Sequence, residues 1–459
     1  MLTQLVFERI EGNSMKKCRA SWIALGCALG LMIGCQTEAP APEAVKADAP
    51  AKAEAAVRGV DAANKVIRVG ALNDESGPAA VIGKPFAAGK RILAAQVNAG
   101  GTDILPEGWK VELVEKDHGY NPGKAEAAYK EIKDQVLFIG TSFGTPNTLP
   151  LRPYLQQDNM VAFPASLSSA MANFEHTPPA GASYTLEAMR AMDWIVESAG
   201  GADKVKVGII YDQTDYGKDG YAGLKAAAEH YKTTIAAEQT IAPGQKDFTA
   251  VIGALKQAGA THVLLTVLAS STGPILGTSA KMGYMPTWVG QTPSWIDPFF
   301  AHPQLPAQIF GKFVWLSGMP FWGEAVPGMD TFLAAYEKYG KPMKARPDFY
   351  TMMSYIQGRL ALEAANLALK AEGGALNPDS YMTALRGIDG WNAGGMIKPI
   401  SLKSFPYATA TQVRILKPDF EKKSWNVVAD YAEAASMAKP EAPAAKAAPE
   451  AAPEAAPAK

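Results

Sequence analysis

The sequence is poor in cysteine, in histidine and in net charge. Its 459 residues include 3 Cys and 5 His, and 44 Lys+Arg stand against 45 Asp+Glu, for a formal net charge of −1. This balance excludes the basic stripe of a nucleic-acid-binding protein and a polybasic segment for membrane docking. So few cysteines also exclude a disulfide framework and a multi-thiolate metal site.

The cysteines are confined to the N-terminus, because Cys35 is the last of them. A body without thiols suits an oxidising compartment, where a stray thiol would pair wrongly. Residues 16–19 are basic, and the apolar run at 21–33 has the length of a signal peptide but is too short to span a membrane. We therefore expect residues 1–34 to be a signal peptide, with Met15 as its true start.

The apolar run ends in Leu-Met-Ile-Gly-Cys at residues 31–35, which resembles the lipobox of bacterial lipoproteins. This resemblance implies that Cys35 is lipidated and holds the protein on the periplasmic or extracytoplasmic face of a membrane. Residues 35–64 are then the lipidated Cys and an Ala/Pro-rich linker. Residues 436–459, rich in Ala, Pro, Glu and Lys, are expected to form a disordered tail, because such composition buries little apolar surface.

Between these tails, apolar strands alternate with amphipathic helices separated by short Gly/Pro turns. The alternation breaks near residues 174–183 and then restarts. This pattern predicts an α/β fold of two doubly wound lobes with parallel sheets. The expected strands are 66–72, 111–114, 136–139, 160–163, 206–211, 234–239, 262–268, 288–290 and 412–416. The expected helices are 85–98, 124–133, 149–157, 186–198, 218–231, 248–258, a helix from about 274, and 349–370.

Catalytic motifs are weak. Residues 140–144 match the Gly-x-Ser-x-Gly elbow of hydrolases, with Ser142 as the nucleophile. Only His302 fits the required late Asp–His order, and no oxyanion motif accompanies it. Residues 83–90 miss the phosphate-loop spacing by one residue, and no metal-ligand spacing appears. The sequence therefore predicts no enzyme, no cofactor and no metal, with a Ser142 hydrolase as the weaker alternative.

Small hydroxyl residues follow three strands of the first half, at 76–78, 142–145 and 165–169. Turns at the carboxyl ends of parallel strands gather where ligands bind in open α/β sheets. Free N–H groups and hydroxyls there suit a carboxylate or another anion. Each turn alone is explained by helix capping, whereas three that converge favour a binding site.

The chain resembles the type I solute-binding proteins of bacterial ABC importers, the Leu/Ile/Val-binding family. The resemblance spans nearly the whole body and depends on the order and spacing of several short motifs. These are residues 67–70 (IRVG), 76–78 (SGP), 96–101 (QVNAGG), 144–146 (GTP), 163–166 (FPAS), 211–212 (YD), 215–218 (DYGK), 246–248 (KDF) and Tyr355.

The resemblance implies two lobes that are joined by a three-strand hinge and close on a small molecule. Its implied crossings lie near residue 183, at 314–316 and at 394–397. Lobe 1 would then comprise residues 65–183 plus 316–395, and lobe 2 residues 184–315 plus 396–435. The implied function is delivery of a ligand, by a monomer, to the membrane subunits of an ABC permease. A ligand sensor for a signalling partner is the alternative.

Position by position, the resemblance implies that Thr145, Ala165 and Ser166 hold the ligand carboxylate. Tyr216 would close from lobe 2, and Phe349 or Tyr350 would line an apolar wall.

Four positions depart from the amino-acid binders. Leu268 and Thr292 stand where those proteins carry a Tyr and a Glu for the ammonium, Ile82 replaces a pocket Tyr, and Leu167 replaces a carboxylate-site Thr. A buried ammonium without a counter-charge is costly, so Asp212, Asp215 or Gln291 would have to substitute. A branched-chain or related amino acid and an aliphatic or aromatic acid both remain open as ligands. The aromatic-rich segment 288–322 would enlarge the pocket, form core or form the face that meets the permease.

Overall fold

The computed structural model describes residues 57–408 and 410–437, which belong to the unit Ala55–Lys459. The predicted signal peptide, Cys35, most of the linker and nearly all of the C-terminal tail lie outside these residues. Within 57–408 and 410–437, no helix has the length and apolarity that crossing a membrane requires.

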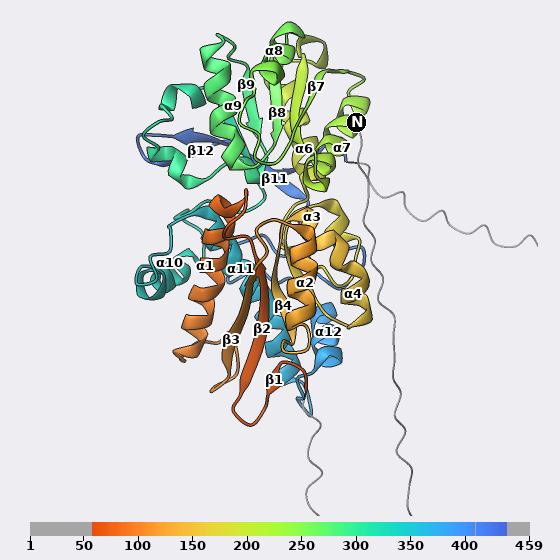
Figure 1. The fold of residues 1–459 in the computed structure, drawn as a ribbon, viewed down its shortest axis with the longest axis vertical. Helices are drawn as coiled ribbons and strands as arrows, with labels where there is room; N and C mark the ends of the chain where they lie inside the picture. Colours follow the sequence, from red (N-terminus) through yellow and green to blue (C-terminus); the bar gives the residue numbers. More distant parts are fainter. Residues whose placement is uncertain (1–56, 409, 438–459) are drawn as a thin grey trace, which may run out of the picture. The chain divides into compact units, whose positions relative to one another are not determined.

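The first lobe is built on a five-stranded sheet (Figure 1). Strand β2 pairs in parallel with β3 on one side and β4 on the other, β5 pairs in parallel with β4, and the short β1 runs antiparallel to β2. The strands are β1 (Val60–Asp61), β2 (Val66–Asn73), β3 (Lys110–Asp117), β4 (Phe138–Phe143) and β5 (Ala162–Ala165).

Helices cover both faces of this sheet. Successive strand residues point to opposite faces, so neighbouring residues of one strand pack against different helices. Phe138 packs in the cluster with α1 (Ala80–Asn98) and α11 (Phe349–Lys370), whereas Ile139 packs with α2 (Pro122–Ile132). The other helical segments of this lobe are α3 (Thr145–Thr148), η1 (Leu149–Leu151), α4 (Arg152–Gln157), α5 (Ser169–Ala172), α10 (Met329–Ala335), the π-helical turn η6 (Tyr336–Gly340) and α12 (Pro378–Gly387).

Helix α1 begins at Ala80, five residues before the expected start at Pro85. Proline removes an N–H donor, which normally ends a helix or marks its first turn. Here the carbonyl that this N–H would have bonded, that of Val81, accepts a hydrogen bond from Arg346 at 2.7 Å instead. The Arg346 side chain thus replaces the hydrogen bond that proline cannot donate. The local sequence around Pro85 gives no sign of this distant partner.

The second lobe contains a seven-stranded sheet in the order β12-β11-β10-β9-β8-β6-β7. Five neighbouring strands are parallel, whereas β11 and β12 form an antiparallel hairpin at one edge. The expected all-parallel sheet is therefore wrong at this edge. The strands are β6 (Val207–Asp212), β7 (Ile235–Ile241), β8 (His262–Thr266), β9 (Thr287–Gly290), β10 (Phe313–Ser317), β11 (Gln412–Asp419) and β12 (Ser424–Glu433).

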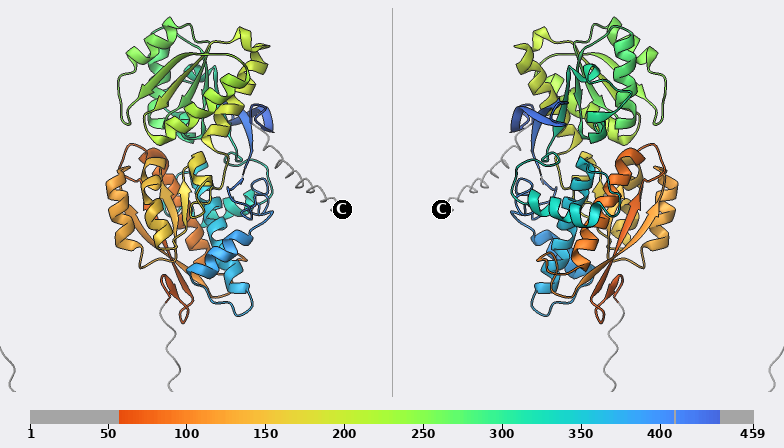
Figure 2. Two further views of the ribbon diagram at one scale, coloured as in Figure 1. Left: turned by 90° about the vertical axis from the view of Figure 1, so that its right-hand side faces the viewer. Right: turned by 90° about the vertical axis from the view of Figure 1, so that its left-hand side faces the viewer.

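This sheet is also covered on both faces. Ile209 packs with α6 (Tyr184–Ala199) and α7 (Asp215–His230), and Ile210 with the cluster that contains α8 (Thr249–Gln257) and α9 (Ala269–Lys281). The short 3-10 segments are η2 (Ala202–Lys204), η3 (Thr292–Ser294), η4 (Asp297–Ala301) and η5 (Ala307–Phe310). The two views of Figure 2 give the same arrangement of helices around each sheet.

The chain passes between the lobes three times, as the resemblance implies, but two crossings fall later than expected. Residues 314–316 belong to strand β10 of lobe 2, so the second crossing follows Ser317. Residues 394–397 stay with lobe 1, where Trp391 pairs with Ile400 and the Tyr407 N–H donates to the Ala172 carbonyl at 3.0 Å. The third crossing therefore lies between Tyr407 and β11.

An ion pair between a buried arginine and a partly exposed glutamate joins the segment after the second crossing to the segment after the third. Arg414 of β11 donates to both carboxylate oxygens of Glu324, and its guanidinium lies 4.6 Å from the Tyr431 ring and 5.3 Å from the Phe321 ring. Paired guanidinium and aromatic contacts of this kind hold a buried Arg in one orientation. The two segments therefore enter the hinge as one fixed unit.

Candidate ligand-binding site

A cavity lined by residues of both lobes encloses about 480 Å³ of unfilled space, counted to its mouth. Its walls come from the carboxyl ends of lobe 1 strands, from α1 and α11, and from the loops after β8 and β9. The lining residues are Ile82, Phe86, Tyr120, Phe143, Gly144, Thr145, Ala165, Ser166, Leu167, Tyr184, Tyr216, Leu268, Thr292, Pro293, Tyr350 and Met353.

The structure brings all eight predicted ligand-binding residues to this one cavity. They are Ile82, Thr145, Ala165, Ser166, Tyr216, Leu268, Thr292 and Tyr350. Phe349, the alternative to Tyr350, instead packs edge-on against Trp315, with ring centroids 4.9 Å apart. Their contacts with a ligand remain a prediction.

Several lining residues were missed by the sequence reading. Phe86 lies four residues after Ile82 on α1, and Met353 lies three residues after Tyr350 on α11. Residues at those spacings share a helix face, so the helical periodicity held the signal. Tyr120 follows β3 after a turn, and Tyr184 opens α6. Neither carries a local motif.

The polar end of the cavity is a pair of hydroxyls. Thr145 follows β4 through Gly144, whose φ of 90° is a left-handed value that glycine adopts without strain. Ser166 follows β5, and its Oγ lies 2.7 Å from Thr145 Oγ1. Ser166 Oγ also accepts from the Ser168 N–H at 3.2 Å, which fixes its position. Two strand ends of one sheet thus present hydroxyls side by side.

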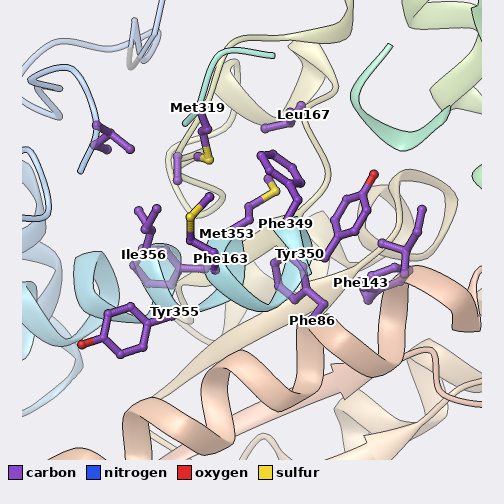
Figure 3. Packing of buried hydrophobic residues seen from close by; sticks show 14 of the residues in the cluster. Phe86, Phe143, Phe163, Leu167, Met319, Phe349, Tyr350, Met353, Tyr355 and Ile356 are labelled. Atoms are coloured by element: carbon purple, nitrogen blue, oxygen red, sulfur yellow. The ribbon is translucent and has the colours of Figure 1, made fainter. Parts of the chain in front are cut away.

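Apolar side chains form the rest of the lining. Figure 3 shows Phe86 of α1 and Tyr350 and Met353 of α11 near one another, with Phe143 of β4 beside them. The Phe86 and Phe143 rings meet edge-to-face at 5.9 Å. Ile82 and Leu268 add aliphatic surface from the two lobes. This wall suits an apolar ligand body.

The tyrosine hydroxyls from α7 and α11 already have acceptors in the protein. Tyr350 Oη lies 2.6 Å from the Thr292 carbonyl oxygen and 3.0 Å from that of Trp295, and Tyr216 Oη lies 3.3 Å from that of Val267. The Tyr216 and Tyr184 rings meet at 4.6 Å. These rings therefore contribute shape and apolar surface more than free hydrogen-bond donors.

Among the described residues that line the cavity, none carries a charged side chain. The nearest carboxyl behind the wall is Glu187 of α6, which is fully buried and accepts from the Thr292 hydroxyl and, at 3.0 Å, from the Thr292 N–H. Burial raises the pKa of Glu187 to about 8, and the Thr292 hydrogen bonds only partly oppose this. Near neutral pH this carboxyl is therefore mostly protonated.

Of the three residues named as substitutes for the counter-charge, the two carboxylates have partners of their own. Asp212 accepts from the Thr214 N–H at 2.7 Å, and Asp215 pairs with Lys218 at 3.6 Å on an exposed helix turn. Gln291 donates through Nε2 to the Tyr184 carbonyl oxygen at 2.5 Å, while its Oε1 has no hydrogen-bond partner and lies next to Gly220 of α7. None of the three lines the cavity.

The aromatic-rich segment 288–322 forms core instead of a larger pocket. Trp295 is fully buried and meets Phe299, Phe310 and Phe313 with centroids 5.3–5.6 Å apart. Trp425 of the unpredicted strand β12 lies against Trp295 at 4.6 Å. The packing depends on a partner strand that the sequence reading did not contain.

Ser142 lies outside the cavity lining. It is 1 % exposed, and its Oγ lies 2.8 Å from Thr148 Oγ1 in the core of lobe 1. This environment gives the hydroxyl no hydrogen-bonded His, which a nucleophilic Ser needs. In the part of the chain that the structure describes, no group of three or more Cys, His, Asp or Glu is arranged to hold a metal.

Besides the Tyr350 hydrogen bonds, two carboxylates join the lobes close to the cavity. Asp219 of α7 accepts from the Ser169 N–H at 3.0 Å, three residues after Ser166. Asp297 of η4 accepts from the Phe349 N–H at 2.8 Å, beside Tyr350. Hydrogen bonds across the seam therefore flank both ends of the cavity.

Two α/β lobes, three crossings and an enclosed cavity at the seam define a two-lobed binding protein. A family model described as periplasmic binding protein matches residues 66–412. The chain belongs to this family, which confirms the resemblance to type I solute-binding proteins. A relative from Brucella abortus (strain 2308), named Leu/Ile/Val-binding protein homolog 7, is 23 % identical over 326 residues, covering 67 % of this chain and 79 % of the relative.

Solved structures share the fold. The fatty acid ABC transporter substrate-binding protein from Thermomonospora curvata has a TM-score of 0.75 and 22 % identity, covering 83 % of this chain and 95 % of that one. A branched-chain amino acid ABC transporter protein from Thermus thermophilus, solved with bound valine, has a TM-score of 0.71 and 19 % identity, covering 81 % and 98 %. At these identities the likeness establishes the fold alone.

The buried Glu187 predicts a pH-dependent stability. Its folded-state pKa of about 8 lies above the ordinary value of 4.5, so its contribution is fully present below about 4.5 and is lost as pH rises toward 8. Across that range we expect the unfolding free energy of Glu187→Gln to rise relative to that of the wild type by roughly 5 kcal/mol.

Urea unfolding from pH 5 to 9 measures this difference. Glu197→Gln, on an exposed position of the same helix, is the matched control and should follow the wild type. Parallel pH profiles for wild type and Glu187→Gln would contradict the assignment.

Proposed function

We propose that this protein binds a small apolar carboxylic acid in the interlobe cavity and delivers it to an ABC permease. The carboxylate would lie against Thr145, Ala165 and Ser166, and a branched or aromatic body would fill the apolar part. Two similar solved proteins represent the two classes of ligand. One is named as a fatty acid ABC transporter substrate-binding protein, and the other was solved with bound valine. The chemistry of the cavity is what separates the two classes.

The observation that carries the proposal is the lack of a charged side chain among the cavity-lining residues of the described chain. An α-amino acid brings an ammonium that must leave water on binding. Burying it without a counter-charge costs several kcal/mol. Leu268 and Thr292, at the positions of the ammonium ligands in amino-acid binders, supply neither a charge nor a free acceptor.

A carboxylate is easier to hold in this setting. The hydroxyls of Thr145 and Ser166 donate to an anion once their mutual hydrogen bond rearranges, and backbone N–H groups at the two strand ends add further donors. No paired cation is required, because hydrogen bonds to a carboxylate from such donors are worth about 1.5–3 kcal/mol each. The Thr145–Ser166 pair is therefore the proposed carboxylate subsite.

The apolar part of the ligand would contact both lobes. Ile82, Phe86 and Met353 belong to lobe 1, whereas Tyr216 and Leu268 belong to lobe 2. A ligand that touches both lobes stabilises the closed arrangement over any open one, since only the closed arrangement offers all contacts at once. The Asp219–Ser169 and Asp297–Phe349 hydrogen bonds would then form as the lobes close.

Export and lipidation of Cys35 complete the proposal. A periplasmic binding protein works outside the cytoplasm, and a lipid on Cys35 would keep a monomeric receptor near its permease. A ligand sensor that reports the closed state to a signalling partner is the alternative. The sensor and the transport receptor would share the same binding site and differ only in their partner. Loss of ligand uptake when the permease is deleted would identify the transport receptor.

A Ser142 hydrolase is the weaker alternative of another class. The buried Ser142–Thr148 hydrogen bond and the absence of Ser142 from the cavity lining speak against it. Covalent labelling of Ser142 by a fluorophosphonate would reverse this judgement.

The choice of ligand class is tested with a matched pair. Leucine and 4-methylpentanoate differ only in the ammonium group. Titration calorimetry at pH 7 should give 4-methylpentanoate an affinity at least about 100-fold higher, because a buried ammonium finds no counter-charge. Equal or tighter binding of leucine would contradict the proposal.

The carboxylate subsite is tested by Thr145→Ala combined with Ser166→Ala. Loss of two donors to a charged group should weaken binding of 4-methylpentanoate by roughly 3 kcal/mol, about 100-fold. Thr145→Ser keeps a hydroxyl and should bind within a few-fold of the wild type. Unchanged affinity in the double variant would reject this subsite.

The membrane anchor is tested by Cys35→Ser in a bacterial host. The wild type should incorporate radiolabelled palmitate and enter the detergent phase of a Triton X-114 extract, whereas the variant should do neither. Cys27→Ser, within the predicted signal peptide, is the control and should keep the label. Labelled Cys35→Ser would place the lipid elsewhere.

A further inference from the structure

A tyrosine that the sequence reading missed reaches the cavity from the edge of the lobe 1 sheet. Tyr120 follows β3, and β2 lies between β3 and β4. Neighbouring strands lie about 4.8 Å apart, so the ends of β3 and β4 are separated by roughly 10 Å. The Tyr120 ring nevertheless packs on Phe143 at the end of β4, with ring centroids 6.4 Å apart. The turn after β3 therefore folds back across the end of β2 toward the ligand cavity.

The backbone of this turn is strained at Tyr120. Its φ of 58° lies in the left-handed region, which bulky side chains rarely adopt. Hydrogen bonds hold the turn there, because the Tyr120 N–H donates to His118 Nδ1 at 3.0 Å and the Gly119 N–H donates to Asp117 Oδ1 at 3.0 Å. Residues held in such conformations cluster at ligand-binding and active sites. The strain therefore points to a function for the side chain that it positions.

The hydroxyl end of the Tyr120 ring lies against Gly144. A Cβ added at Gly144 would be 2.7 Å from Tyr120 Cε2 and 3.3 Å from Cζ, the carbon that carries the hydroxyl. The lack of a side chain at Gly144 thus makes room for the ring. Gly144 directly precedes Thr145, whose hydroxyl belongs to the proposed carboxylate subsite, and all three residues line the same cavity. The Tyr120 hydroxyl is therefore placed beside a strand end where an anion would bind.

The Tyr120 hydroxyl is a free donor. In the part of the chain that the structure describes it makes no hydrogen bond, unlike the hydroxyls of Tyr216 and Tyr350. Its oxygen is not sealed off by other protein atoms, so it stays open to the cavity that Tyr120 lines. Burial raises the pKa of Tyr120 well above its usual range. The hydroxyl therefore keeps its proton and can donate it at any working pH.

We propose that Tyr120 is a further ligand-binding residue, whose hydroxyl donates a hydrogen bond to the ligand carboxylate beside Thr145 and Ser166. The inference rests on the proposed function and adds a third donor to its subsite. Donors from the ends of β3, β4 and β5 would then converge on one anion. A neutral phenol supplies a charge-assisted hydrogen bond to an anion without the desolvation cost of a second buried charge.

The test is Tyr120→Phe, which removes the hydroxyl and keeps the ring. Affinities of 4-methylpentanoate and of its neutral isostere 4-methylpentanamide are measured by titration calorimetry at pH 7. We expect the acid to lose roughly tenfold or more and the amide to lose less, because a hydrogen bond to a charged group is the stronger one. Tyr154→Phe, which removes a hydroxyl that bonds Glu126 at 2.7 Å outside the cavity, is the matched control and should leave both affinities unchanged.

The stability of the ligand-free protein separates a ligand contact from a structural role. A hydroxyl without a protein partner contributes little to folding, so free Tyr120→Phe should melt at the temperature of the wild type. The same concentration of acid should then raise the melting temperature of the variant less than that of the wild type. A free variant that melts lower, with acid and amide weakened equally, would overturn the inference.

Failure of the inference and failure of the proposed function give different results. A wild type that does not bind 4-methylpentanoate would overturn the proposed function and this inference together. A wild type that binds the acid no more tightly than Tyr120→Phe does would overturn the inference alone and leave Thr145 and Ser166 as the carboxylate donors.

Discussion

The dominant constraint on this molecule is the cost of taking charge out of water at the seam between its lobes. The cavity lies among aromatic and aliphatic side chains, and the lining residues of the described chain bring no charge of their own. Whatever binds must therefore carry little charge or carry one that hydroxyls and N–H groups satisfy. Thr145 and Ser166 present two hydroxyls to the cavity, whereas neither Leu268 nor Thr292 carries a charge.

The same constraint organises the second layer around the cavity. Glu187 lies behind Thr292 in an environment that raises its pKa, and Lys90 lies behind β5 with neutral hydrogen-bond partners. The acid behind the lobe 2 wall is thus mostly protonated near neutral pH. Farther out, the Arg414–Glu324 pair holds the second and third hinge segments together.

Sequence reasoning reached the fold because alternation of strands and helices is a local signal. The turns after parallel strands indicated a site at the strand ends, whereas the eight predicted site residues came from the family resemblance and line one cavity. Sequence reasoning failed where a distant partner decides the outcome. The hydrogen bond from Arg346 to the Val81 carbonyl oxygen allows α1 to begin five residues before Pro85. Trp425 packs on Trp295, so the aromatic segment forms core. The Tyr407 hydrogen bond to Ala172 keeps residues 396–407 with lobe 1. Residues 83–90 showed only an imperfect phosphate-loop spacing. The burial of Lys90 could not be predicted because it depends on contacts with α11, which is distant in the sequence.

The most direct test of this account is the identity of the molecule that the protein carries when it is isolated from its own cells. Native mass spectrometry of the purified protein, followed by denaturation and analysis of the released molecule, gives that answer without a choice of candidate. The account predicts a monocarboxylic acid with a branched or aromatic body and no amine. Release of an α-amino acid in equimolar amount would contradict it.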